Sequence, residues 1–215
     1  LSKKITDGTP GVGGANIDLI GVPLAQYHCP SDSERRDADE IEAYSSYNPA
    51  IPALAVSNYV ASGLNCDPCQ YGYLQRNETK FGCPSGPTGI FYRNSKTRIG
   101  QITDGTSKTF LAGERMYSPR HGVISVAYWP GPPGSVSNAS ACWSAHMIAG
   151  SKTTFGTADR NQMINGQAFG FHSEHPGGVQ VAFADGSGRL ISDTIAQDVA
   201  VQLLEIADGA VPSGF

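Results

Sequence analysis

The chain has 215 residues and a formal net charge of -4, from 15 lysine and arginine residues against 19 aspartate and glutamate residues. This length accommodates one domain, or one domain with an elaborate insertion. The acidic balance argues against binding to nucleic acid, which needs a basic face. No stretch reaches the roughly 18 apolar residues of a membrane span. The 26 glycines and 14 prolines predict short strands and ordered loops rather than long helices.

The first part of the chain predicts loops around one or two strands. We expect residues 1–26 to form an extended lead-in, since their middle is rich in glycine. Residues 56–61 alternate weakly between apolar and polar side chains and predict a strand. Residues 65–88 combine cysteine, glycine and proline and predict a loop insertion, and residues 90–92 predict a short strand.

The cysteines weakly favour an oxidising compartment. Their odd number leaves one thiol unpaired, or paired between chains. We predict one disulfide from the Cys66/Cys69 pair to Cys83. A zinc site would need four converging ligands, and Cys66-x-x-Cys69 has no second pair of this kind. The five residues are Cys29, Cys66, Cys69, Cys83 and Cys142.

The middle of the chain predicts a turn and then a buried strand. Asp104-Gly105 is a turn pair whose glycine takes a positive φ readily. Residues 108–114 read as a strand that ends at Glu114. Glu114 is either a lone buried acid or the partner of a nearby arginine (Arg98, Arg115 or Arg189). Residues 122–129 are another strand candidate, and residues 135–166 predict a second loop insertion.

The C-terminal part predicts a hairpin followed by a helix. Val179, Val181 and Phe183 alternate with polar or small residues, which indicates a half-buried strand. Asp185-Gly186 is a hairpin signal, after which residues 189–191 return antiparallel. Ser192 or Asp193 can cap a helix over residues 194–207, with Gly209 as its stop. The apolar face of that helix contains Ile195, Val199, Leu203 and Ile206. These elements predict an α+β fold with an antiparallel sheet and a C-terminal helix.

His172, Glu174, His175 and Asp185 are the candidate chemical constellation, either as a metal site or as an acid/base pair. His172 and His175 would not share a face of an extended chain. A strand over residues 179–184 separates His175 from Asp185 by ~20 Å unless Gly177-Gly178 folds the chain back. We therefore predict a structural role, in which His175 bonds to loop backbone and Asp185 caps its own turn. Asp104 and Asp185 are candidate calcium ligands, although the EF-hand pattern is absent.

No catalytic residue is assigned. A nucleophilic hydrolase would need Ser or Cys beside His and an acid, and no Gly-x-Ser-x-Gly elbow occurs.

Four islands, in the same order along the chain, resemble a family of prepilin-like envelope proteins that is abundant in planctomycetes and has no known function. In one island, nine residues separate His175 from Asp185-Gly186, and Gly177-Gly178 follows shortly after the histidine. The other three are Tyr27-His28-Cys29-Pro30-Ser31-Asp32, Ser57-Asn58-Tyr59-Val60, and a central block from Gly89 to Glu114-Arg115. Gly188 departs from the family pattern, which usually has a β-branched residue there.

The resemblance implies a single pilin-like head over residues 1–215. Family members begin with a prepilin leader and a long hydrophobic helix, and this sequence begins instead with Leu1-Ser2-Lys3-Lys4. Either the front has been removed, or this member never had it.

From the resemblance we expect a non-catalytic structural subunit of a pilin-like, pseudopilus or fibre assembly, secreted or in the cell envelope. Its partners would be other copies of itself or related subunits, without nucleic acid. It would contact a membrane only through the missing helix. We expect no cofactor other than a possible structural calcium ion.

Two other functional classes stay open. A secreted module that binds carbohydrate or another envelope polymer would use flat aromatic faces, for which the candidates are Tyr71, Tyr73, Tyr92, Trp129 and Trp143. A metal-dependent hydrolase would be built around His172, His175 and Asp185.

Overall fold

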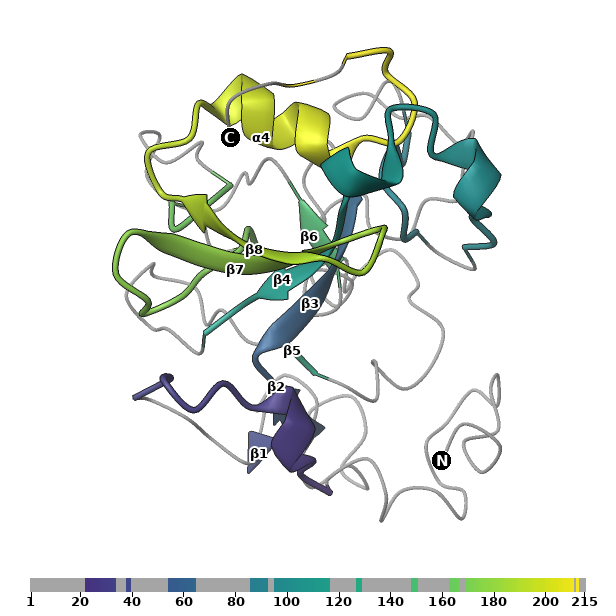
Figure 1. Ribbon diagram of the computed structural model, residues 1–215. Coiled ribbons are helices and arrows are strands. Elements are labelled where there is room, and N and C mark those ends of the chain that lie inside the picture. Colours follow the sequence, from purple (N-terminus) through teal and green to yellow (C-terminus); the bar gives the residue numbers. More distant parts are fainter. Residues whose placement is uncertain are drawn as a thin grey trace.

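The computed structural model describes residues 22–33, 38–39, 54–64, 86–92, 95–116, 127–128, 148–150, 163–166, 169–210 and 212. Two sheets and one α-helix form the described part of the fold, with α4 at one end of the molecule and β1 and β2 at the other (Figure 1). The strands are β1 (Ala38–Asp39), β2 (Leu54–Ser57), β3 (Tyr59–Leu64), β4 (Phe110–Glu114), β5 (Ala127–Tyr128), β6 (Ile148–Gly150), β7 (Gly178–Phe183) and β8 (Gly188–Ser192). The helices are α4 (Gln197–Leu204) and the 3-10 turns η1 (Ala25–Tyr27), η2 (Ile99–Gln101) and η3 (Thr106–Lys108).

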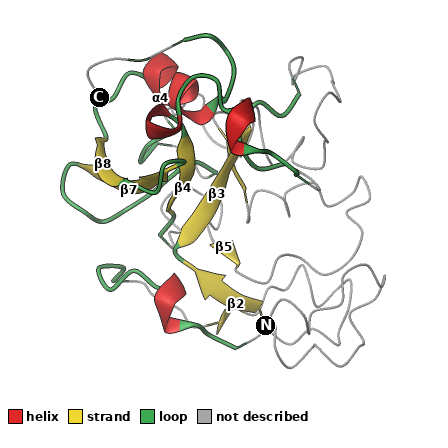
Figure 2. Ribbon diagram, turned by 45° about the vertical axis from the view of Figure 1, so that its right-hand side comes forward, coloured by secondary structure: helices red, strands yellow, loops and turns green. Residues whose placement is uncertain are grey.

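The larger sheet has five strands in the order β6-β3-β4-β7-β8. The pairs β3/β4, β4/β7 and β7/β8 are antiparallel, and β6 adds to β3 in parallel. The predicted α+β class with an antiparallel sheet is therefore confirmed, although the parallel edge strand was not expected. Figure 2 shows α4 packed beside this sheet.

The hydrophobic core lies between the sheet and α4. Phe110 of β4 meets Phe171 and Phe183 edge to face, with ring centroids 5.9 Å and 5.4 Å away. From the helix, Ala200, Leu203 and Leu204 are fully buried against this cluster. Burial of such side chains provides most of the driving force that holds the helix on the sheet.

The β7–β8 hairpin confirms the prediction from alternation. Val179, Val181 and Phe183 are buried, whereas Gln180 is exposed. At the tip, Asp185 Oδ1 accepts hydrogen bonds from the Ser187 amide at 2.9 Å and the Ser187 hydroxyl at 2.7 Å. These bonds lower the pKa of Asp185, because they favour its charged form.

The strand predicted over residues 56–61 is wrong as a single element. β2 belongs to a small sheet of order β1-β2-β5, and β3 belongs to the larger one (Figure 2). The break falls at Asn58, whose amide donates to Tyr27 O at 2.7 Å and whose carbonyl accepts from the Arg115 amide at 2.6 Å. Hydrogen bonds to two distant segments redirect the chain there.

The C-terminal helix is shorter than predicted at both ends. It covers Gln197–Leu204, and Ala196 at its N-cap makes no side-chain capping bond. The hydroxyl of Ser192 instead accepts the Thr194 amide at 3.1 Å, which closes a separate turn. Ile195 and Val199 are half-buried against the core as expected, but Ile206 is buried beyond the end of the helix.

Two further strand predictions need correction. Residues 90–92 form no strand, although Phe91 N–H donates to Ser62 O at 3.0 Å. The strand predicted from residue 108 begins at Phe110, because η3 takes up Thr106–Lys108. The predicted disulfide among Cys66, Cys69 and Cys83 lies outside the described residues, as do Tyr71, Tyr73, Trp129, Trp143 and most of both loop insertions.

Asp104 holds the segment that follows α4. Its Oδ2 accepts the Asp208 amide at 2.8 Å and its Oδ1 accepts the Gly209 amide at 3.1 Å, and the residue is buried. The predicted turn is present, with Gly105 at φ +105°.

We expect Asp104→Asn to lower the free energy of unfolding by about 2 kcal/mol, because one charged acceptor becomes a donor that faces a backbone amide. Urea denaturation measures the change. Asp198→Asn, at an exposed position of α4, is the matched control with an expected loss under about 0.5 kcal/mol. Equal losses in the two variants would contradict the anchoring role of Asp104.

Candidate functional site

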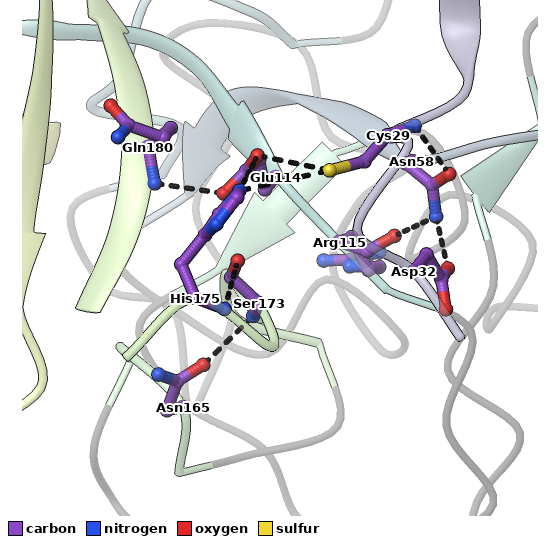
Figure 3. A network of polar contacts seen from close by, with 9 residues as sticks. All are labelled: Cys29, Asp32, Asn58, Glu114, Arg115, Asn165, Ser173, His175 and Gln180. Atoms are coloured by element: carbon purple, nitrogen blue, oxygen red, sulfur yellow. Dashed lines mark hydrogen bonds and ion pairs between the residues drawn. The ribbon is translucent and has the colours of Figure 1, made fainter. Parts of the chain in front are cut away.

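Residues from all four islands of the sequence meet at one end of the larger sheet (Figure 3). Cys29 follows η1, Asn58 separates β2 from β3, Glu114 is the last residue of β4, and His175 lies in the loop before β7. Within the described residues, Cys29, Glu114 and His175 form a group of three whose possible ligand atoms all lie within 4.8 Å of one another.

The position of Glu114 depends on where β4 stops pairing with β7. Beyond Gly113, the β4 backbone bonds instead to His172, whose amide donates to Glu114 O at 2.8 Å. The amide of Gln180 on β7 then bonds to the side chain of Glu114, at 2.9 Å from Oε2. The other oxygen, Oε1, faces His175 Nε2 at 3.2 Å and Cys29 Sγ at 3.6 Å. The buried carboxylate is therefore held in one orientation.

Asn58 fixes Cys29. Its Oδ1 accepts the Cys29 amide at 2.8 Å, and its Nδ2 donates to the Asp32 carboxylate and to Arg115 O at 3.4 Å. This side chain thus ties the Cys29–Asp32 loop to the end of β4. Cys29 is a free thiol and is buried.

The loop before β7 positions His175. The Ser173 amide donates to Asn165 Oδ1 at 2.9 Å, and the His175 amide donates to Ser173 Oγ at 3.1 Å. The imidazole, whose side chain is 29% exposed, contacts Glu114 and lies 3.7 Å from Cys29 Sγ. The prediction that this side chain bonds to loop backbone is therefore wrong.

Neither alternative considered for Glu114 holds, since its carboxylate is buried beside His175 rather than alone or paired with an arginine. Arg115 bonds elsewhere. Its fully buried guanidinium donates from Nε and Nη2 to Gly170 O at 3.0 Å and 2.9 Å, and from Nη2 to Phe169 O at 2.6 Å. Burial lowers the pKa of Arg115 to about 9, so the group stays charged at neutral pH.

The carboxylate of Glu114 influences two neighbouring acids. Burial raises the pKa of the Cys29 thiol, and the negative charge of Glu114 raises it further. Burial also raises the pKa of Tyr59, and the charges of Cys29 and Glu114 raise it further. The thiol is therefore protonated at neutral pH and can donate to Glu114.

A small pocket opens beside the group, with room for about one water molecule. A space of this size suits a single ion or water molecule rather than a sugar chain. Its walls are formed by Cys29, Ser31, Asp32, Asn58, Glu114, Met116, His172, Ser173 and Glu174.

The structure does not bring together the other residues that the sequence singled out. β7 lies between His175 and Asp185, which places them at opposite ends of an extended strand. Both oxygens of Asp104 are occupied by backbone amides, and Asp185 bonds within its own turn. His172 is buried, and its backbone amide and carbonyl bond to Glu114 and Met116.

Cys29 and Asn58 were missed as site residues. Their only signal in the sequence was that each belongs to one of the islands. The sequence did not predict that these islands meet in the folded protein.

The described fold is that of an α+β protein with a thiol, a carboxylate and an imidazole gathered at one end of its sheet. The chain belongs to the family described as "Protein of unknown function (DUF1559)", whose model matches residues 1–198. Comparisons with curated proteins and with solved structures gave no match. Among the described residues, no helix has the length and apolar character needed to cross a bilayer.

Proposed function

We propose that the chain is the globular head of a non-catalytic structural subunit, in a pilin-like or fibre assembly at the cell surface or outside the cell. The observation that carries this proposal is how the residues of the islands are used. Asn58, Glu114 and Arg115 are buried and bond to chain segments far away in sequence. Side chains used in this way stabilise the fold, as expected of a structural subunit.

The free edge of the larger sheet supports contact with a second copy. β8 is its last strand, and no strand in the described part of the chain pairs with the outer edge of β8. Residues 188–190 are exposed, and Leu190 presents 49% of its surface. Edge strands offer unpaired amides and carbonyls to a neighbouring chain. This edge is the proposed lateral contact.

Mass spectrometry of the native protein from the producing cells tests the pilin-like assignment. A longer chain with an N-methylated hydrophobic helix before Leu1 is the expected result. A native chain that begins at Leu1 would contradict assembly through such a helix.

We expect Leu190→Lys to weaken self-association about tenfold, because a charge on the edge strand disfavours edge pairing. Sedimentation velocity of the purified chain measures the association. The free energy of unfolding should change by under about 0.5 kcal/mol, since the side chain is half exposed. Ile99→Lys, at a more exposed apolar position on η2, is the matched control and should not alter association. The same effect in both variants, or in neither, would rule out the β8 edge as the contact.

A further inference from the structure

We propose that Cys29, Glu114 and His175 bind one divalent metal ion of the zinc type. The Cys29 thiol releases its proton to solvent as the ion binds, so the site offers a thiolate, a carboxylate oxygen and an imidazole nitrogen, with a fourth position open to a water molecule or an incoming donor. This metal site is independent of the assembly proposed above, and it differs from the calcium and His172/Asp185 sites considered from the sequence.

The separations of the three ligand atoms match a tetrahedral centre. Zinc bonds to sulfur at about 2.3 Å and to nitrogen or oxygen at about 2.0–2.2 Å, so its ligands lie about 3.4–3.6 Å apart. The distances here are 3.6 Å from Cys29 Sγ to Glu114 Oε1, 3.7 Å from Sγ to His175 Nε2, and 3.2 Å from Nε2 to Oε1. An ion slightly out of the plane of these three atoms would therefore lie at ordinary zinc bond lengths from the sulfur, the nitrogen and the oxygen, and the fourth tetrahedral position would point away from that plane.

Without the ion, the same three atoms make only long hydrogen bonds. A charge-assisted bond between imidazolium and carboxylate is usually about 2.7–2.9 Å long. The His175–Glu114 contact is 3.2 Å, and the sulfur is nearly equidistant from both partners. The three atoms lie 3.2–3.7 Å from one another, a spacing that the ligands of a shared ion adopt.

Neighbouring groups hold the ligands in place, as outer partners do in metal sites. The Gln180 amide occupies Glu114 Oε2 and leaves Oε1 toward the cysteine and histidine. Asn58 holds the Cys29 backbone and is itself held by Asp32 (Figure 3). None of these bonds uses the atoms that would bind the metal, so the ion could enter without breaking them.

The ligand types select the metal. Thiolate and imidazole favour zinc and similar transition metals, whereas calcium and magnesium prefer oxygen ligands. Three protein ligands with an open position fit zinc sites that retain a water molecule. The pocket beside Cys29 and Glu114 provides room for that fourth ligand. A bound ion would also cross-link the segment after η1, the end of β4 and the loop before β7.

Titration of the purified, metal-free protein with Co²⁺ tests the site, since Co²⁺ reports its ligands by absorption. We expect saturation at one equivalent, with a thiolate-to-cobalt charge-transfer band and intense tetrahedral d–d bands that are lost on adding Zn²⁺. Zn²⁺ should also raise the thermal midpoint of unfolding, whereas Ca²⁺ should not. Failure of the wild-type protein to bind either transition metal would overturn the proposal.

Variants locate the ion. Cys29→Ser and His175→Gln should each weaken Co²⁺ binding at least about 100-fold, because loss of a ligand exceeds the effect of losing an outer partner. His175→Gln keeps every thiol, so it separates this site from binding by the other cysteines. Asp185→Asn, at the far end of β7, is the control and should bind as the wild type does. A thiolate band that survives in folded Cys29→Ser protein, as checked by circular dichroism, would place the metal elsewhere and contradict the proposal.

Discussion

Arg115→Met is expected to lower the free energy of unfolding by about 3 kcal/mol, because it leaves two buried carbonyl groups without their charged donor. The guanidinium donates to Gly170 O and Phe169 O, both of which lie in a buried turn. Methionine fills much of the volume but leaves these carbonyls without their charged donor. Relief of the cost of burying a charge offsets only part of this loss, because hydrogen bonds to charged groups contribute about 1.5–3 kcal/mol each. Urea denaturation, with its midpoint and slope, measures the effect.

Arg98→Met is the matched control for Arg115→Met. Arg98 is exposed at the start of η2, where its backbone amide bonds to Gln101 Oε1 at 2.7 Å. The substitution leaves that backbone bond available, so a change under about 0.5 kcal/mol is expected. If Arg115→Met were as mild as Arg98→Met, the guanidinium would not be needed to hold the 169–172 segment.

Gly178→Ala is expected to cost about 3 kcal/mol, at the upper end of ordinary overpacking. A Cβ at this position would overlap the carbonyl oxygen of Ile191 and lie 2.8 Å from its carbonyl carbon. Both atoms belong to the backbone of β8, so no side chain can rotate away. The strand would have to separate from β8 at the residue where the hairpin begins, three positions after His175.

Gly188→Ala provides a test in the same hairpin. Nothing lies within 4 Å of a Cβ at Gly188, which starts β8. Alanine there should be neutral or stabilise by about 0.5 kcal/mol, because it reduces the freedom of the unfolded chain. Thermal unfolding of both variants measures the difference, and equal stabilities would show that β8 can shift to accommodate a methyl group.

Local features of the sequence predicted the C-terminal hairpin well. Alternation placed Val179, Val181 and Phe183 in the core because side chains of a strand point to opposite faces. Asp185-Gly186 specified the turn because the carboxylate accepts bonds from residue 187 and the glycine accepts φ +85°. Nearest neighbours determine such features, so they can be predicted without the fold.

Predictions failed where distant segments compete for the same residues. Asn58 interrupts a run that alternates like one strand, because its polar groups bond to Tyr27, Cys29 and Arg115. The helix begins after a turn that uses the Ser192 hydroxyl, which was expected to be its cap. In both cases a long-range contact or an alternative local bond overrides the preference visible in the sequence.

The sequence by itself determined the fold class, the hairpin and the islands to which the site residues belong, because side-chain alternation and turn chemistry depend on neighbours along the chain. The tertiary structure decided which of those residues meet. Glu114 lies 85 residues from Cys29 and 61 from His175, and their contact depends on where β4 parts from β7. The register of a sheet and the path of its loops, rather than any local pattern, set that meeting point.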